Sequence, residues 1–283
     1  MNGDYEPKTF WNGRFRMYGH TGDADSLLYV YDQPQRLRAI EKSLSRCGIL
    51  INTDTRILDI GCGTGDLIDR FVKFANPEIT GIDISDATLS FTRKRFATNR
   101  KVRLFFMGVE EMDFPSNSFD LAIGINVLQH IIGEEAFLKA VKNMVRVIRA
   151  GGYLFVMDFS PVKVEVRKPA PYVIIRTRQE YVEAFEGSGC KFISEFGLPR
   201  IGVRIYRKIN NVITQLKRSR NSQKMNVKTP LPKNEQGFSA KSRFAYTMRV
   251  ILLKLARHFD HWLAPFPSSY TDMRILIFEK VPR

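Results

Sequence analysis

Three features are scarce in this 283-residue sequence, and each scarcity excludes a class of protein. No run of about 18 apolar residues occurs and the N-terminus has no apolar signal core, so neither a membrane-spanning helix nor secretion is predicted. The cytoplasm is the expected compartment. Only three cysteines are present, without the paired spacing of a disulfide framework or a zinc site: Cys47, Cys62 and Cys190. Reduced thiols and no bound metal are therefore expected.

Acidic residues are the third scarcity, and they are scarce in one segment only. Between Arg200 and Arg257 lie 15 of the 44 Lys and Arg residues but one of the 29 Asp and Glu residues, Glu235, so this segment carries 14 of the net charge of +15. The rest of the chain is nearly neutral. The basic character is therefore a property of one insertion and not of the whole fold.

Strands and helices alternate through the middle of the chain. Apolar runs predict strands over residues 56–60, 79–84, 102–107, 119–125 and 153–158, and helical spacing predicts intervening helices over residues 66–74, 86–95 and 134–148. A later helix over residues 178–188 and strands over 190–196 and 273–279 follow. This order predicts an α/β fold with a doubly wound, mostly parallel sheet, helices on both faces and ligands at the carboxyl ends of the strands.

The N-terminal 48 residues are expected to form an aromatic and helical cover. Aromatic side chains crowd residues 1–31, which should fold over either a hydrophobic groove of the core or a bound ligand. A helix is predicted to begin near Asp32 as its N-cap, with Pro34 in the first turn, and to end at Gly48.

The basic segment, residues 199–268, is predicted to be a helical insertion ahead of a final core strand in residues 269–283. Apolar and basic residues interleave in amphipathic patterns over residues 201–224 and 243–263, with a polar, proline-containing loop over 221–241. Three interpretations stay open: a structural cap over the substrate site, a peripheral membrane contact, and a nucleic-acid surface.

A glycine-rich turn follows the first strand directly. In Gly61-Cys62-Gly63-Thr64-Gly65 the glycines are spaced two apart, whereas a dinucleotide fingerprint has its third glycine one residue later. Such a turn lets the backbone approach a ligand and directs N–H groups at it. No lysine of a phosphate-binding loop, no zinc-protease motif and no nucleophile elbow accompanies it.

The block from Leu58 to Gly65 resembles the first motif of the class I S-adenosylmethionine-dependent methyltransferases, and the similarity extends over residues 49–198. The resemblance implies S-adenosylmethionine as cofactor. It implies that Asp59 helps to hold the ammonium group, that the turn lies under the methionine moiety, and that Asp83 binds both ribose hydroxyls. It also implies further cofactor contacts from the turn and from the segments after the second, third and fourth strands: Gly61, Cys62, Gly63, Gly65, Ile84, Val109, Glu110, Asn126 and Val127.

Two positions depart from the family pattern or admit more than one role. At the position where the family usually has an acid that binds the adenine, this sequence has Gly108. The adenine contact implied by the resemblance would then come from Glu110, from water or from the backbone. Methyl transfer needs alignment above all, and a general base only for a hydroxyl or carbon acceptor. Candidate bases are His130 and Asp158 at the strand ends and His20 and Tyr18 in the N-terminal cover, each of which could equally be a structural polar residue.

The resulting prediction is an enzyme that methylates a small-molecule acceptor, with an anionic or lipid-linked sugar or prenyl intermediate favoured by the charge. One alternative is an RNA-modifying methyltransferase that uses the basic insertion. A second alternative is a non-catalytic protein that keeps the fold and binds the cofactor. The oligomeric state has no signature in the sequence.

Overall fold

The computed structural model describes residues 5–23, 26–198, 205–209, 211, 247–255 and 272–282. The chain divides into two compact units. The first unit consists of residues 1–21, 37–198 and 268–283, and the second of residues 22–36 and 199–267. Each unit is described by itself.

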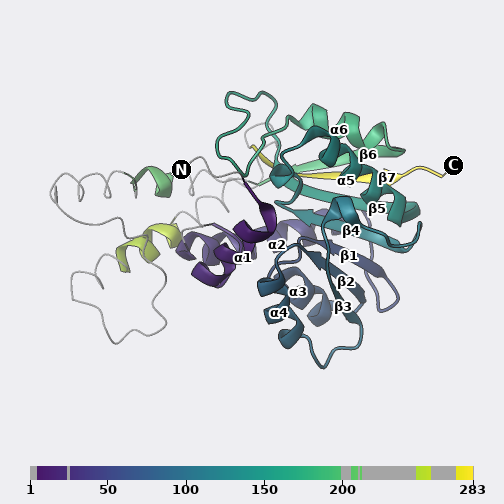
Figure 1. The fold of residues 1–283 in the computed structure, drawn as a ribbon, viewed down its shortest axis with the longest axis horizontal. Helices are drawn as coiled ribbons and strands as arrows, with labels where there is room; N and C mark the ends of the chain where they lie inside the picture. The colour runs from purple at the N-terminus through teal and green to yellow at the C-terminus, as the bar shows by residue number, and fades with distance from the viewer. Residues whose placement is uncertain are drawn as a thin grey trace. The chain divides into compact units, whose positions relative to one another are not determined.

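A sheet of seven strands is the centre of the first unit, within the described part of the chain (Figure 1). Its order is β3-β2-β1-β4-β5-β7-β6. The strands are β1 (Arg56–Ile60), β2 (Glu78–Asp83), β3 (Val102–Phe106), β4 (Phe119–Ile125), β5 (Ile148–Phe159), β6 (Cys190–Gly197) and β7 (Met273–Lys280). The first five run parallel, whereas β7 is antiparallel to both β5 and β6. The predicted α/β fold with a mostly parallel sheet is confirmed.

Helices cover both faces of this sheet. They are α3 (Asp66–Phe74), α4 (Asp86–Arg95), α5 (Glu134–Val147) and α6 (Arg178–Glu186), with short 3-10 turns η1 (Val109–Glu111) and η2 (Leu128–His130). Alternate strand residues point to opposite faces, so Leu58 joins the core beneath α5 and α6 while Ile57 joins the core beneath α3. Both faces are therefore buried, which explains the continuous apolar runs of the central strands.

The N-terminal region is more helical than the sequence indicated. Residues Pro7–Tyr18 form α1, which begins at the side chain of Glu6 and ends at the left-handed Gly19. Helix α2 spans Ser26–Arg46 and begins six residues before the expected Asp32. The N-cap prediction for Asp32 was wrong, because the helix already runs through Asp32. Its carboxylate instead pairs with Arg36, one turn later in the same helix, at 2.6 Å.

Strand β5 begins earlier than predicted, at Ile148 instead of Tyr153. Helix α5 passes directly into the strand, and Ile148 already pairs with Phe119 of β4. The left-handed Gly151 then shifts the register before regular pairing resumes at Tyr153. The adjacent Gly151 and Gly152, a pair typical of the end of a helix, here form an irregularity within a strand.

Apart from Gly22 and Asp23, the described part of the second unit is helical. It comprises residues 26–36 of α2 and helical residues at 205–209, 211 and 247–255. The remainder of the two predicted insertion helices, and the predicted loop over 221–241, lie outside the described residues. Among the described residues, no helix is long and apolar enough to cross a membrane.

The antiparallel end of the sheet depends on an aromatic contact. Phe278 of β7 is fully buried and stacks on Phe185 of α6 with ring centroids 4.4 Å apart. We expect Phe278→Ala to lower the free energy of unfolding by about 3–5 kcal/mol, because it removes transfer energy and leaves a cavity. Urea denaturation measures this loss. Leu50→Ala, at a side chain that is 87% exposed, is the control and should change stability little; equal effects would contradict this packing.

Candidate functional site

The glycine turn between β1 and α3 has a conformation that only glycine supports well. Gly61 has φ +67°, and a Cβ atom there would lie 2.5 Å from Cγ2 of Val127. Gly65 has φ +78° at the start of α3, and a Cβ atom there would meet the ring of Phe96 at 2.6 Å. The turn therefore lies in direct contact with Val127 of the segment after β4.

Asp83 at the end of β2 holds this turn from the side. One carboxylate oxygen accepts the N–H of Gly63 at 2.9 Å and the other accepts the N–H of Ser85 at 2.8 Å. Burial raises the pKa of Asp83, and these N–H groups oppose that rise. Each oxygen keeps a lone pair for a further donor, which suits a ligand with two hydroxyl groups.

Two buried oxygen atoms beside the turn have no hydrogen-bond partner among the residues that the structure describes. They are Oδ2 of Asp59 and Oδ1 of Asn126, which stand at the ends of β1 and β4, neighbouring strands of the sheet. Asn126 is held in a left-handed conformation with φ +56°, and its N–H donates to the carbonyl of Met157 at 2.7 Å. Buried oxygen atoms without donors are costly, so this pair is suited to a cationic or hydrogen-bond-donating ligand.

The electrostatics of Asp59 point the same way. Burial raises its pKa to about 8, with further contributions from the charges of Asp83 and Asp66. A ligand ammonium group beside it would stabilise the charged carboxylate. These residues therefore fit the methionine end and the ribose of S-adenosylmethionine. The buried thiol of Cys62 lies against Gly81, and its N–H and carbonyl bond to Ile82 and Gly65 at 3.0 Å and 2.9 Å, so its predicted cofactor contact stays a prediction.

Glu110 occupies the space where the family pattern has an acid. A Cβ atom at Gly108 would lie 3.2 Å from Oε2 of Glu110 and 3.5 Å from Cγ2 of Ile84. The side-chain amide of Asn143 on α5 holds the turn η1 by donating to the carbonyls of Val109 and Glu110. The carboxylate of Glu110 is thus placed beside the apolar surface of Ile84, which supports the expected adenine position.

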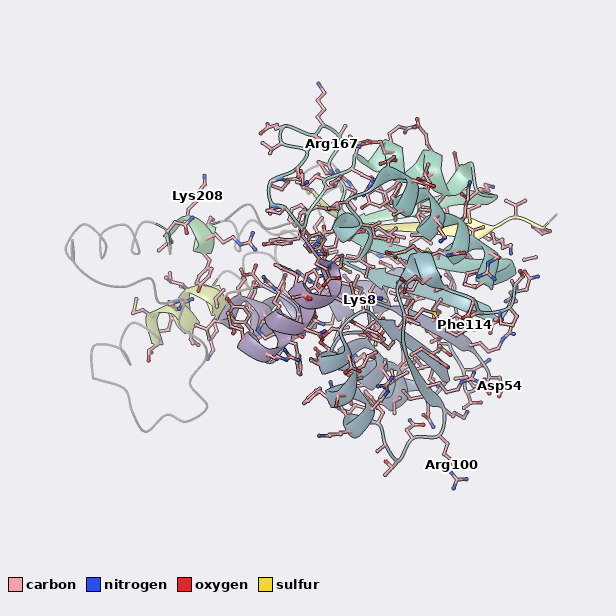
Figure 2. All side chains as sticks on the ribbon, in the orientation of Figure 1. Lys8, Asp54, Arg100, Phe114, Arg167 and Lys208 are labelled. Atoms are coloured by element: carbon pink, nitrogen blue, oxygen red, sulfur yellow. The ribbon has the colours of Figure 1, made fainter. Side chains whose placement is uncertain are left out.

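Helix α1 crosses this edge of the sheet and contacts three segments that border the site. Asn12 accepts from the hydroxyl of Ser85 at 2.9 Å and from the N–H of Ala87 at 3.0 Å, at the start of α4. Lys8 lies over the ring of Phe106 and 3.7 Å from Glu111. Figure 2 labels Lys8 on α1 and, away from it, Asp54 and Arg100 in the loops that lead into β1 and β3.

The ring of Trp11 completes this contact by meeting His130 edge-on at 4.8 Å, while Phe10 stacks on Tyr172 at 4.5 Å. The predicted aromatic cover therefore lies over the carboxyl ends of the strands. These contacts could not be predicted from the sequence, because residues 7–18 are largely polar and show only weak helical spacing of apolar side chains.

His130 has partners at both ring nitrogens. Nδ1 lies 2.7 Å from the carbonyl oxygen of Tyr172, which can only accept, so Nδ1 carries the proton. Nε2 lies 3.2 Å from the amide nitrogen of Gln129, whose oxygen accepts the N–H of Phe159. Burial lowers the pKa of His130 to about 4, and the charge of Arg14 adds to this. A neutral histidine in this network is suited to positioning the Tyr172 segment.

The other predicted bases lie at different places. His20 is buried and its ring stacks with that of Tyr18 at 6.0 Å, just after α1. Asp158 at the end of β5 is buried and accepts from the hydroxyl of Tyr181 at 3.1 Å, while its Oδ1 has no partner. Burial raises the pKa of Asp158 to about 7. The structure brings Asp158 close to the η2 turn that carries His130.

Two residues of this region were not predicted from the sequence. Arg176 is fully buried, donates to the carbonyls of Leu128 and Ile131, and lies over the ring of Phe137 at 3.8 Å. Gln129 joins His130 to β5. An arginine in an irregular segment normally indicates a surface, so no sequence signal marked Arg176 as buried.

Comparison with known proteins supports the family resemblance. Residues 57–152 match the family model described as a methyltransferase domain. The ubiquinone/menaquinone biosynthesis C-methyltransferase UbiE of Ectopseudomonas mendocina (strain ymp) is 32% identical over 115 residues, covering 39% of this chain and 44% of that protein. The O-methyltransferase rstn1 of Aspergillus nomiae is 29% identical over 155 residues, covering 52% and 66%. The chain thus spans less than two thirds of either relative.

Among solved structures, phosphoethanolamine N-methyltransferase 2 of Haemonchus contortus in complex with S-adenosyl-L-methionine has a TM-score of 0.61 at 16% identity, covering 99% of this chain and 61% of that one. At this identity the match concerns the fold. Together these comparisons show that residues 57–152 match a methyltransferase domain and that the chain shares the fold of a methyltransferase. The cofactor bound in that solved structure, S-adenosyl-L-methionine, is the one that the sequence resemblance implies.

The burial of Asp59 leads to a trade-off between stability and binding. A raised pKa means that the folded chain holds a proton up to about pH 8 whereas the unfolded chain releases it near pH 4, so this group destabilises the fold as the pH rises between these values. Asp59→Asn removes this penalty, so it should raise the Tm more at pH 8 than at pH 5. The expected rise is roughly 2–4 °C for each kcal/mol gained in the free energy of unfolding. It should also weaken S-adenosylmethionine binding about tenfold or more.

Differential scanning fluorimetry and calorimetry measure these two effects. Asp54→Asn, in the exposed loop before β1, is the matched control and should change neither. A gain in Tm that is independent of pH would contradict the assigned burial of charge.

The role of His130 can be tested without the acceptor. Trp11 contacts His130 and the chain has two tryptophans, so Trp262→Phe leaves Trp11 as the only indole reporter. Protonated imidazole quenches indole fluorescence, and we expect the quenching midpoint near pH 4 because burial disfavours the charged ring. His130→Asn in the same background should abolish the transition. A midpoint between pH 6 and 7 would instead identify a histidine that titrates as a general base.

Proposed function

We propose that this chain transfers the methyl group of S-adenosylmethionine to a small-molecule acceptor, with a lipid-linked or prenylated ring as the favoured class. The observation that carries the proposal is the pair of buried oxygen atoms without partners, on Asp59 and Asn126, beside the glycine turn that Asp83 holds. This arrangement provides for a cation and for two hydroxyl groups at adjacent strand ends, as the methionine and ribose parts of the cofactor require.

The chain's own contribution to the reaction is alignment. S-adenosylmethionine supplies an electrophilic methyl group when bound. Asp59 and Asn126 hold its amino-acid end, Asp83 holds the ribose, and Glu110 with Ile84 borders the adenine. Helix α1, fixed to α4 through Asn12, covers this edge and limits access of water. Correct alignment alone can lower the barrier by several kcal/mol.

The acceptor class is argued from the side chains around Tyr172. The rings of Tyr5, Phe10 and Trp11 gather with Tyr172 and His130 at the carboxyl ends of β4 and β5. Aromatic walls of this kind favour an apolar or ring-shaped ligand. The UbiE relative, named as a C-methyltransferase of ubiquinone and menaquinone biosynthesis, is consistent with such an acceptor.

The anchoring of Tyr172 supports its role beside the acceptor. The segment 172–176 is bonded to the turn after β4 by His130, by the N–H of Ile174 to the carbonyl of Gln129 at 2.8 Å, and by Arg176. This fixation keeps one wall of the acceptor region rigid relative to the cofactor residues Asn126 and Val127. Rigid support of this kind is what alignment catalysis needs.

Calorimetry followed by a transfer assay tests the proposal. Asp83→Ala should weaken S-adenosylmethionine binding about tenfold or more, because two charge-assisted contacts to hydroxyl groups are lost. Asp86→Ala, three residues later and largely exposed, is the matched control and should bind normally. Circular dichroism shows whether Asp83→Ala, which also loses its bonds to Gly63 and Ser85, remains folded.

Transfer is then measured with methyl-tritiated S-adenosylmethionine and three acceptors: a prenylated hydroquinone, phosphoethanolamine and bulk RNA. Label in the hydroquinone fraction is the expected result. Cofactor binding with label in the RNA or phosphoethanolamine would overturn the acceptor class only. Failure of the folded wild-type chain to bind S-adenosylmethionine would overturn the whole proposal.

A further inference from the structure

The helix at residues 247–255 in the second unit has a buried side and an exposed side that are both apolar. On the buried side, Leu253 is 4% exposed and packs with Leu28 of α2 and with Tyr206. The hydroxyl of Tyr206 also accepts from Nε of Arg249 at 3.0 Å. One side of this helix is thus accounted for by packing within its own unit.

The opposite side consists of Met248, Ile251 and Leu255. Their exposed fractions are 40%, 43% and 60%. Spacings of three and four residues place all three on one face of the helix, within about a sixth of its circumference and away from Leu253. Single exposed apolar residues are common, but three aligned on one helical face form an outer face that is suited to an apolar partner.

The surroundings of this outer face are basic. Lys254 is exposed on its flank, and Lys208 projects from the helical residues 205–209 of the same unit (Figure 2). Arg207 is paired with Asp23 at 2.5 Å. Beyond these, the sequence from Arg200 to Arg257 contains a single acidic residue. A partner of this region must therefore combine an apolar phase with negative charge.

We propose that the outer face of this helix, Met248, Ile251 and Leu255, docks on an anionic lipid surface. The three side chains would enter the boundary between headgroups and acyl chains, while Lys254 on the flank contacts anionic headgroups. A nucleic acid satisfies the charge but offers no counterpart for three aligned aliphatic side chains. A second copy of this chain would bring the same positive segment into repulsive contact. The inference is independent of the methyl-transfer proposal.

Vesicle co-sedimentation of the full-length chain tests the docking. We expect binding to vesicles of phosphatidylcholine mixed with phosphatidylglycerol, and little binding to phosphatidylcholine alone. The double variant Ile251→Ser, Leu255→Ser should reduce the vesicle partition coefficient at least about tenfold, because it removes inserted apolar surface. Lys254→Glu should weaken binding severalfold and should do so less at high salt.

Leu50→Ser is the matched control, since this exposed leucine lies in the other unit, and it should bind as the wild type does. All substituted side chains are exposed, and thermal unfolding verifies that the variants fold. Equal binding to neutral and anionic vesicles, or unchanged binding of the double variant, would overturn the proposal. So would tight binding of homopolymeric RNA that the double variant retains, or a wild-type dimer in sedimentation velocity that the double variant lacks.

Discussion

The packing of two carboxyl groups beneath one glycine turn is the constraint on which the site depends. Asp59 and Asp83 end neighbouring strands, and the charge of Asp83 contributes to the raised pKa of Asp59. Asp83 is stabilised by two backbone N–H groups, but Asp59 keeps an oxygen without a partner. The fold therefore keeps a buried carboxyl group whose charged form is unfavourable and would be stabilised by a bound cation. Buried groups with shifted pKa values of this kind are typical of functional sites.

The parts of this site that could be predicted are those whose residues are local in sequence. The turn from Gly61 to Gly65 follows an apolar strand, and the strand pattern places Asp83 at the end of the next strand, while the family resemblance implied their roles. The alternation of strands and helices along the chain followed from local patterns, but the position of β7 between β5 and β6 did not. Strand β5 was placed late because paired glycines are typical of a helix end, whereas Gly151 and Gly152 lie within the strand at an irregularity of its pairing.

The acceptor side could not be predicted because its contacts connect distant segments. Asn12 binds residues more than seventy positions later, and His130 binds the carbonyl of Tyr172 across an irregular connection. Arg176 is buried by its hydrogen bonds and by the ring of Phe137, which no periodicity reports. The sequence identified His130 as a polar residue near the site, and its role depends on partners that only the fold supplies.

The same reasoning assigns different partners to two features of the described residues: the buried oxygen atoms at the strand ends and the exposed apolar face of the helix at residues 247–255. At the strand ends, buried oxygen atoms without donors indicate a small cationic ligand, because a site of that size can be satisfied by one group. On the helix at residues 247–255, the exposed groups are aliphatic and span two turns, so only an extended apolar phase can cover them together. A chain that acts on a lipid-linked ring would need both properties, since the acceptor itself resides at a membrane surface while the cofactor is dissolved in water.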